Sequence, residues 1–450
     1  MAGDHWISEN DLATLTRLLE GQRVVDGRAE PLNPPVSVHR LELFIGTDED
    51  GKRFLTRNPA KPVDSKVLAP SVGSASTTVR APVAVTPSAA IAAHRLRGSL
   101  LAGAVGDALG APIESDSIDR IRERTGPHGL TDFVRAYEGL GTITDDTQMT
   151  LATADALIRA HAGLRRGAQV DAHYELQRGY QRWLHTQGVP WERARGPHER
   201  GEHPDGWLMT HRDLFHRRAP GSTCFFALKG FAQTGEMATF TRTINNSKGC
   251  GGVMRAAPIA LWSDDPAAVF ALAAASGALT HSHPSGYLSA GAFAVIIQQL
   301  LREVPLLAAI DVAKAQLATW NGHEEQTLAL DQAVRLAQQG PPTPEKVATL
   351  GGGNVGETAL AIGVYATLAT NTLDEALLVA VNHSGDSDST GSVTGNLAGA
   401  IHGERAIRAS WLDRLELRDV IAQVADDLRA EFGPNPPGGD WFLRYPAASA

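Results

Sequence analysis

The chain has 450 residues, 43% hydrophobic and 20% charged, which is typical of a globular protein with one large domain and an additional segment. Its net charge of −9 argues against a nucleic-acid-binding protein, which usually presents a basic face. Two cysteines cannot form a disulfide framework, no apolar run is long enough for a membrane span, and polar residues occupy the first twenty positions where a signal peptide would be apolar. We therefore expect a cytoplasmic protein that does not bind membranes.

Residues 1–60 are predicted to form a small α+β unit. Leucines recur on one face of a helix-like stretch over 10–19. A β-branched, alternating segment over 36–45 is followed by an acidic turn and by a return strand that begins at Phe54. This pattern predicts a β-hairpin packed on one helix. The hairpin carries more apolar residues than such a small unit can bury, so we expect it to pack on the following domain or on another protein.

Residues 61–93 are rich in Pro, Ser and Ala and are predicted to be an extended linker. Residues 94–445 are predicted to form a compact all-α domain, because Ala-rich segments of helical length alternate there with loops rich in Gly, Pro and Ser. The predicted helices lie near 94–109, 145–162, 171–186, 266–279, 286–302, 308–317, 326–338, 356–369, 373–382, 389–402 and 417–431.

Small residues form a strip along the first predicted helix of this domain. They recur at every fourth position, at Gly98, Ala102, Gly106 and Gly110. Such spacing places them on one face, where another backbone can approach closely. The strip is explained equally well by a tightly packed core helix. Asp107 and Glu114 add carboxylates at the end of this helix, where they oppose its dipole, so a counter-charge is expected nearby.

Two acidic segments each precede a predicted helix. The first, TDDTQM, begins at Thr144 and contains Asp145 and Asp146. Helix capping explains one of these acidic residues well. It explains less well why two acidic residues are adjacent and have a threonine on each side. The second, SGDSDSTG, contains Asp386 and Asp388, which point the same way in an extended segment. Together the two segments offer the oxygen ligands that two hard cations such as Mg²⁺ require, and nothing suggests zinc.

Two further motifs lie between the acidic segments. In NNSKGCGGVMR the dense glycines allow backbone N–H groups to converge on an anion, and Lys248 and Arg255 add positive charge. An ordinary loop is an equally good explanation of this motif. In THSHPSGY we favour His281 or His283 as a structural hydrogen-bonding residue at a helix start, because the oxygen-rich partners elsewhere disfavour a transition metal.

Taken in order, GSLLAGAVGDALGAPIES, TDDTQM, KGCGGVMRAAPIAL, THSHPSGY and SGDSDSTG resemble the motifs of the ADP-ribosylglycohydrolase family. That family includes the dinitrogenase reductase-activating glycohydrolase and the animal ADP-ribosylarginine hydrolases. The resemblance implies an all-α fold with two Mg²⁺ ions in a central cleft. The metal ligands that it implies are Thr144, Asp145, Asp146, Asp386, Asp388 and Ser389.

The resemblance also bears on the catalytic and the substrate-binding residues. Glu114 matches a glutamate that can reach the metal site in the family, and on physical grounds we expect a carboxylate among Asp145, Asp146 and Glu114 to take or give a proton. The residues expected to bind substrate are Gly249, Cys250, Gly251, Gly252, Val253, Met254 and His281. The chain departs from many family members at Ser384, where they have glycine, and at Ser389, where they have threonine. The Asp-Ser-Asp-Ser form is most similar to the arginine-specific animal hydrolases.

These observations leave three functions open. The first is Mg²⁺-dependent removal of ADP-ribose from arginine side chains of proteins. The second is hydrolysis of serine-linked or small ADP-ribosyl compounds. The third is suggested by immunity proteins that resemble this family and block an ADP-ribosylating toxin with an N-terminal extension, a layout that residues 1–90 match in length and position.

Overall fold

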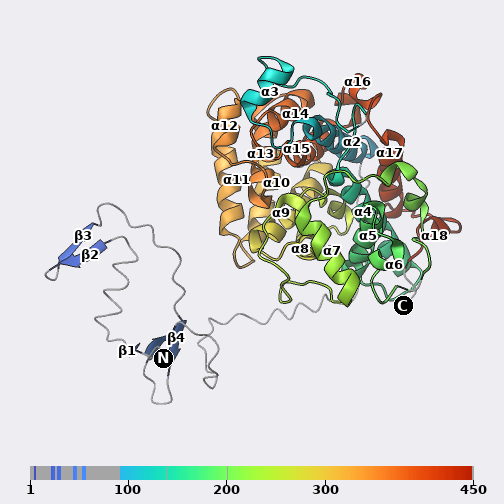
Figure 1. Ribbon diagram of the computed structural model, residues 1–450, viewed down its shortest axis with the longest axis horizontal. Coiled ribbons are helices and arrows are strands. Elements are labelled where there is room, and N and C mark those ends of the chain that lie inside the picture. The colour runs from blue at the N-terminus through green and yellow to red at the C-terminus, as the bar shows by residue number, and fades with distance from the viewer. Residues whose placement is uncertain are drawn as a thin grey trace. The chain divides into compact units, whose positions relative to one another are not determined.

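The computed structural model describes residues 92–447, apart from 138 and 200, and the backbone of five short strands nearer the N-terminus (Figure 1). Contacts divide the chain into two units, Met1–Val83 and Ala84–Ala450. Within residues 92–447 the structure contains helices and loops but no strand, so the predicted all-α class of this domain is confirmed. None of the helices described there is long and apolar enough to cross a bilayer.

The first unit contains three antiparallel strand pairings. Strand β4 (Phe44–Thr47) pairs with β5 (Arg53–Thr56), which confirms the predicted hairpin, although β4 begins later than expected. Strand β1 (His5–Trp6) pairs with the other edge of β5. A second hairpin, between β2 (Gln22–Val25) and β3 (Arg28–Pro31), was not predicted. The helix expected over 10–19 and the linker up to residue 91 lie outside the described residues.

All of the helices predicted after residue 93 are present, with ends that differ by a few residues. In chain order the longer helices are α2 (Ala93–Gly110), α3 (Ile118–Thr125), α4 (Asp145–Arg165), α5 (Ala172–Thr186), α7 (Ser222–Thr234), α8 (Pro266–Ala278), α9 (Pro284–Leu301), α10 (Leu306–Leu317), α11 (Glu324–Ala337), α13 (Gly356–Ala369), α14 (Leu373–Val381), α15 (Ser387–His402) and α17 (Arg418–Glu431). The short helices are α6 (Trp191–Ala194), α12 (Pro344–Ala348), α16 (Ala409–Leu412) and α18 (Trp441–Arg444).

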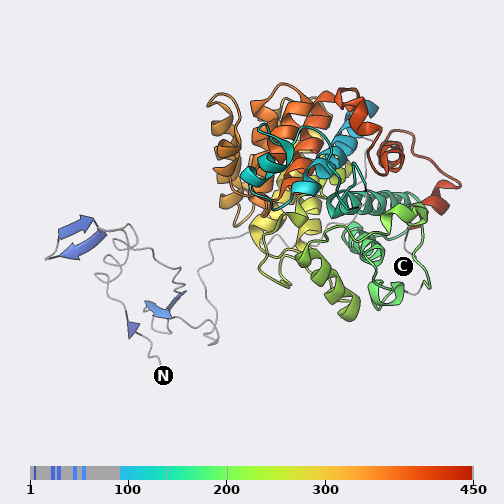
Figure 2. The same cartoon turned by 45° about the horizontal axis from the view of Figure 1, so that its top comes forward.

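Helices α3 and α7 were not predicted. Helix α7 buries only Cys224, Leu228 and Phe231, whereas Phe225 and Phe226 lie off this face, so its apolar residues do not mark one face clearly. Figures 1 and 2 show α10–α13 on one side of the helical unit and α4–α6 on the other. Helix α9 is almost entirely buried and packs against α8, α10 and α13, so it lies in the core of the domain.

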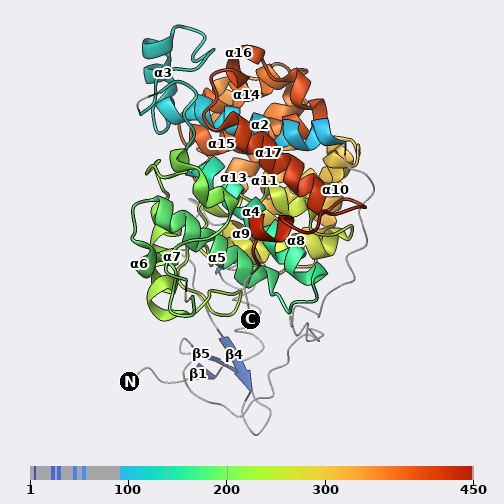
Figure 3. The same ribbon diagram turned by 90° about the vertical axis from the view of Figure 1, so that its right-hand side faces the viewer.

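Helices α2 and α15 form the closest helix pair of the domain, and α17 packs on the outer face of α2 (Figure 3). Their contact is made by glycines, and we call it the glycine seam. A Cβ atom on Gly395 would lie 2.0 Å from the carbonyl oxygen of Ala102, and one on Gly106 would lie 2.0 Å from that of Gly391. The small-residue strip thus has a packing reason, because it lets two backbones touch.

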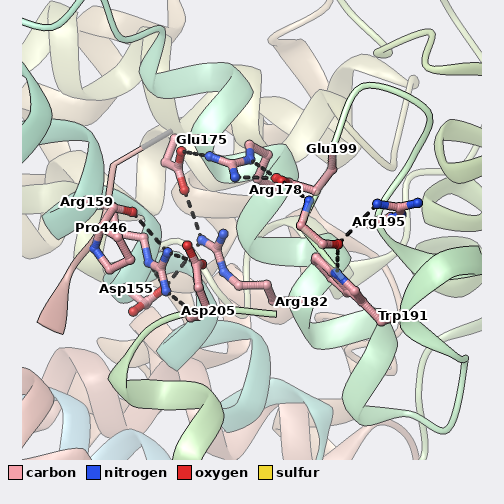
Figure 4. Close-up of polar contacts among 11 residues, drawn as sticks. Asp155, Arg159, Glu175, Arg178, Arg182, Trp191, Arg195, Glu199, Asp205 and Pro446 are labelled. Carbon is pink, nitrogen blue, oxygen red and sulfur yellow. Dashed lines mark hydrogen bonds and ion pairs between the residues drawn. The ribbon is translucent and has the colours of Figure 1, made fainter. Parts of the chain in front are cut away.

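Helices α4 and α5 are joined by buried ion pairs (Figure 4). The fully buried guanidinium of Arg159 lies 2.7 Å from Asp155 and donates to the carbonyl of Pro446 at 3.0 Å. Arg182 lies between Asp155, at 3.3 Å, and Glu175, at 3.0 Å. Because opposite charges face each other, the cost of burying each one is offset, whereas removing one partner would leave an unpaired charge. The network fixes α4 against α5 and the C-terminal segment.

The glycine seam makes a testable prediction about stability. We expect Gly395→Ala to lower the free energy of unfolding by about 1–3 kcal/mol, because the new Cβ atom would push two backbones apart. Gly230→Ala in α7 is the matched control, since its Cβ atom would meet nothing within 4 Å and should add roughly 0.5–1 kcal/mol through helix propensity. Urea denaturation measures both changes. Equal effects of the two substitutions would contradict the proposed tight contact.

Candidate functional site

The two acidic segments meet where α4 and α15 begin. Thr144 caps α4, and its hydroxyl accepts the N–H of Asp146 at 3.4 Å. Asp386 caps α15, and its carboxylate accepts the N–H of Ser389 at 3.3 Å. Capping therefore accounts for Thr144 and Asp386. It does not account for the carboxylates of Asp145, Asp146 and Asp388, which are buried beside these caps.

Asp107 joins the end of α2 to the start of α4. Both of its carboxylate oxygens accept the N–H of Thr144 at 3.0 Å, and one accepts the N–H of Thr147 at 3.1 Å. The counter-charge expected near the end of α2 is thus the positive end of α4. Burial raises the pKa of Asp107 to about 6, although these hydrogen bonds act in the opposite direction. Asp107 was expected to face a counter-charge, but it was not predicted to belong to the site.

Asp145 and Asp146 are held differently. The Oδ2 atom of Asp145 accepts the N–H of Gly221 at 3.1 Å, and the N–H of Asp145 donates to the carbonyl of Arg218 at 3.0 Å. The Oδ1 atom of Asp146 is buried and has no protein partner. Burial, followed by the charges of neighbouring carboxylates, raises the pKa of Asp146 and of Asp388 well above 3.8. The site thus concentrates negative charge in a dry environment.

Glu114 lies at the solvent-exposed rim of this site. It follows a short 3₁₀ turn, Ala111–Ile113, and the next residue, Ser115, donates its N–H to the carbonyl of Gly385 at 2.8 Å. Partial burial and the charges of Asp386 and Asp107 raise the pKa of Glu114. We use the name acid cluster for the six carboxylates that influence one another here, Asp107, Glu114, Asp145, Asp146, Asp386 and Asp388.

The acid cluster has the donor chemistry of a site for hard cations. Asp146 Oδ1 lacks a partner, and the groups that act on the pKa of Asp388 are burial and other carboxylates. A buried cluster of this kind requires positive charge to stay ionised. Among the described residues, no three His, Cys, Asp or Glu side chains are already spaced to hold one ion. The hydroxyls of Thr144 and Ser389 complete an all-oxygen set that fits Mg²⁺, and the ligand assignment stays a prediction.

The segment 249–254, which we call the glycine loop, contacts the acid cluster. The thiol of Cys250 donates to Asp386 Oδ2 at 3.1 Å, and the hydroxyl of Ser389 lies 3.5 Å from the Cys250 sulfur. Ser389 also lies 3.9 Å from the sulfur of Met254. Residues 250–252 form a 3₁₀ turn. The structure thus brings the predicted substrate loop and the predicted metal ligands together.

His281 lies beneath the glycine loop. A Cβ atom on Gly251 would lie 2.9 Å from its ring, and its Nδ1 atom lies 2.8 Å from the hydroxyl of Thr280. This contact pattern supports a structural role for His281. The helix start is capped by its neighbour His283, whose Nδ1 accepts the N–H of Ser285 at 3.1 Å.

The prediction that Arg255 supplies positive charge for an anion is wrong. Its guanidinium is fully buried, lies 4.1 Å from the ring centroid of Tyr180 and donates to Thr280 at 2.9 Å. Lys248 is also engaged with the protein, because its ammonium group pairs with Glu325 at 2.9 Å and with Glu357. Any anion at the glycine loop would therefore be bound mainly by backbone N–H groups.

A second glycine-rich segment, 351–355, was missed by sequence analysis. The backbone carbonyl of Asn354 accepts the N–H of Cys250 at 3.1 Å, and the carbonyl of Gly352 accepts the N–H of Asp386 at 2.8 Å. A Cβ atom on Gly385 would lie 2.1 Å from the Gly352 oxygen, so the two backbones are in close contact. This segment connects the glycine loop to the start of α15. The run of three glycines was a signal that could have identified it.

A groove of about 540 Å³ lies between α7 and the segment 236–247, and we call it the α7 groove. It adjoins the glycine loop at Ser247, which lines the groove and whose hydroxyl accepts the N–H of Gly249 at 3.3 Å. The side chain of Phe226 lines the groove and is 68% exposed. Such a volume suits a small-molecule ligand. Sequence analysis missed this groove, because its two walls meet only in the folded chain.

The buried state of His281 predicts how the free energy of unfolding depends on pH. Burial and the charge of Arg255 lower its pKa from 6.5 to about 3, so the unfolded chain binds a proton below pH 6.5 that the folded chain does not. The free energy of unfolding should fall as the pH decreases through this range, by about 2 kcal/mol between pH 6.5 and 5 from His281 alone. We expect His281→Gln to have a shallower pH profile in urea denaturation. Parallel profiles for the two proteins would contradict the neutral, buried state of His281.

Comparisons with known proteins agree with this geometry. The family model for ADP-ribosylglycohydrolase matches residues 88–437. ADP-ribosyl-[dinitrogen reductase] glycohydrolase of Rhodospirillum rubrum is 25% identical over 335 residues, which cover 73% of this chain and 94% of that protein. The ADP-ribosylarginine hydrolase Tri1 of Serratia proteamaculans is 35% identical over 69 residues, 15% of this chain and 19% of that protein.

A solved structure described as an ADP-ribosylglycohydrolase-related protein complex has the same fold. It matches with a TM-score of 0.52 at 24% identity and covers 76% of this chain and 98% of that chain. Since the family match extends over most of the chain and includes the acid cluster, the glycine loop and the α7 groove, the chain belongs to the ADP-ribosylglycohydrolase family.

Proposed function

We propose that this glycohydrolase removes ADP-ribose from a protein side chain, most readily from arginine, with the help of Mg²⁺. The observation that carries the proposal is the set of contacts that joins the glycine loop to the acid cluster through Cys250 and to the α7 groove through Ser247. An acidic end, a glycine loop in which the described part of the fold does not use the N–H groups of Gly251 and Gly252, and a groove lined partly by Phe226 match the order of ribose, diphosphate and adenosine in ADP-ribose. The two curated relatives named above act on ADP-ribosyl substrates, which supports the same substrate class here.

Each part of the site has a distinct role in this proposal. Thr144, Asp145, Asp146, Asp386, Asp388 and Ser389 would hold divalent cations, which supply the positive charge and Lewis acidity for a glycosidic hydrolysis. The distal ribose would lie against the acid cluster. The glycine loop would bind the diphosphate through its backbone N–H groups. The exposed ring of Phe226 offers a stacking surface for the adenine base in the α7 groove.

Proton transfer is best assigned to Glu114, with Asp145 and Asp146 as the other candidates. Glu114 is exposed at the rim, where its carboxyl group can exchange a proton with solvent and with a leaving group. In contrast, one oxygen of Asp145 is already occupied by the N–H of Gly221. An arginine-linked ADP-ribose is an N-glycoside whose guanidine must leave protonated, so a group that exchanges protons at the rim is required.

The first prediction from this proposed function concerns the metal ligands. We expect Asp388→Ala to lower Mg²⁺-dependent hydrolysis of an ADP-ribosylated peptide by roughly a hundredfold or more, because it removes a ligand of the cation. Calorimetry should show weaker Mg²⁺ binding, while circular dichroism should show the wild-type helix content. Asp419→Ala is the matched control, since the Asp419 carboxylate is fully exposed on α17. Near wild-type turnover of the Asp388 variant would remove Asp388 from the ligand set.

The second prediction concerns the linkage. Arginine-linked substrate should be cleaved at least about tenfold faster than serine-linked substrate, a difference of roughly 1.4 kcal/mol in transition-state stabilisation. The reason is the Asp-Ser-Asp-Ser form of the segment that starts at Asp386. Mass spectrometry of matched peptides, with and without Mg²⁺, measures both rates. Equal or reversed rates would assign the enzyme to serine-linked or small ADP-ribosyl compounds.

The third prediction concerns the N-terminal unit. Deletion of residues 1–90 should leave Mg²⁺-dependent hydrolysis of a small substrate largely intact, because the site residues lie at or after Asp107. The same deletion tests the toxin-blocking hypothesis, which requires loss of affinity for a protein partner while catalysis survives. A large decrease in the melting temperature would instead show that the unit stabilises the catalytic domain. The cytoplasmic location likewise stays a prediction.

A further inference from the structure

Tyr137 lies on the loop that leads into the first acidic segment. Its backbone has a φ of 53°, a conformation that residues other than glycine rarely adopt. Ala136 and Gly139 exchange backbone hydrogen bonds at 3.1 Å, and the hydroxyl of Thr142 donates to the Ala136 carbonyl at 3.1 Å. The loop is thus closed on itself, with the side chain of Tyr137 about half exposed, at 48%. Backbone strain held in place in this way is frequent at ligand contacts.

Arg218 holds the ring of Tyr137 beside the acid cluster. Its guanidinium lies 4.6 Å from the ring centroid and 3.1 Å from Glu416, whose other oxygen accepts the N–H of Ile143 at 3.0 Å. The carbonyl of the same Arg218 accepts the N–H of Asp145 at 3.0 Å. The ring is therefore fixed through one residue to the carboxylate segment that starts α4.

Tyr137 and the glycine loop are connected to different residues of the site. The glycine loop touches the cluster through Asp386 and Ser389, whereas Arg218 and Tyr137 approach it through Asp145. Burial, followed by the charges of Asp388 and other cluster carboxylates, raises the pKa of Tyr137, so its phenol stays protonated and can donate a hydrogen bond. With ADP-ribose extending toward the glycine loop, the modified side chain would leave on the side of Tyr137.

We propose that Tyr137, held by Arg218, is a specificity-determining residue that contacts the protein side chain from which ADP-ribose is released. The inference rests on the proposed function and deepens it, because it assigns the site for the leaving group. The free ring face and the phenol would contact a guanidinium or a hydroxyl-bearing side chain and its flanking peptide. The ADP-ribose part of the substrate would not contact Tyr137.

The test compares Tyr137→Ala, Tyr137→Phe and Phe226→Ala. It measures kcat and KM for arginine-linked and serine-linked ADP-ribosyl peptides and the Kd of free ADP-ribose, all with Mg²⁺. We expect Tyr137→Ala to lower kcat/KM for the preferred peptide by roughly tenfold and to change the ratio between the two linkages. Its Kd for ADP-ribose should stay within about twofold of wild type. Tyr137→Phe should keep most of the preference, because it keeps the ring.

Phe226→Ala is the reciprocal control. It should weaken ADP-ribose binding and leave the ratio between the linkages unchanged, because Phe226 lines the α7 groove. If Tyr137→Ala lowers kcat/KM for the peptide and the affinity for ADP-ribose to the same extent, or changes neither, the inference is wrong while the proposed function stands. If the wild-type enzyme cleaves no ADP-ribosyl peptide with Mg²⁺, the proposed function itself fails.

Discussion

Carboxylates of like charge meet, mostly out of contact with water, where α2 ends and where α4 and α15 begin. Repulsion between them and the loss of hydration both oppose this arrangement, so each group requires positive charge. The structure supplies part of it from backbone N–H groups. Asp107 accepts those of Thr144 and Thr147, and Asp386 accepts that of Ser389. Asp388 shares the N–H of Ser389 with Asp386, and one oxygen of Asp146 has no protein partner, so the remaining charge is left to be neutralised by protons or by cations.

The surrounding fold keeps this unfavourable cluster in place. The glycine seam sets the distance between α2 and α15 by direct contact of their backbones. The buried ion pairs around Arg159 hold α4 farther along its length. The segment 351–355 connects the start of α15 to the glycine loop. Acidic groups fixed by three independent supports cannot spread apart to relieve their repulsion, which keeps the site organised before a cation or substrate binds.

Much of this organisation could be predicted from the sequence, because its signals are local. Helices such as α4 and α15 follow from Ala-rich segments, and the acidic segments stand out because carboxylates and hydroxyls are adjacent at helix starts. The family resemblance placed the glycine loop next to them. The hairpin of β4 and β5 followed from alternation and an acidic turn. These patterns depend on neighbours in the chain, so no knowledge of tertiary structure was needed.

What could not be predicted depends on tertiary packing. The α7 groove is formed by α7 and the segment 236–247, and the weak apolar pattern of α7 gave no signal for a helix. Arg255 was interpreted as a cation for an anionic ligand because its burial against Tyr180 is invisible in the sequence. The sequence predicted a counter-charge near Asp107, and the structure shows that its partners are backbone N–H groups at the start of α4.

The glycine seam also limits how this protein can change by mutation. Any replacement of Gly106, Gly391, Gly395 or Gly399 adds a Cβ atom that would lie 2.0 to 2.3 Å from a backbone oxygen of the other helix. A clash with a side chain can be relieved by shortening that side chain, but a clash with a carbonyl group cannot be relieved by any second substitution. A mutation in the glycine seam therefore cannot be compensated by a second mutation, whereas mutations in the loop around Tyr137 and in the α7 groove can be. Substrate preference can diverge at these surfaces while the spacing of the acids stays fixed.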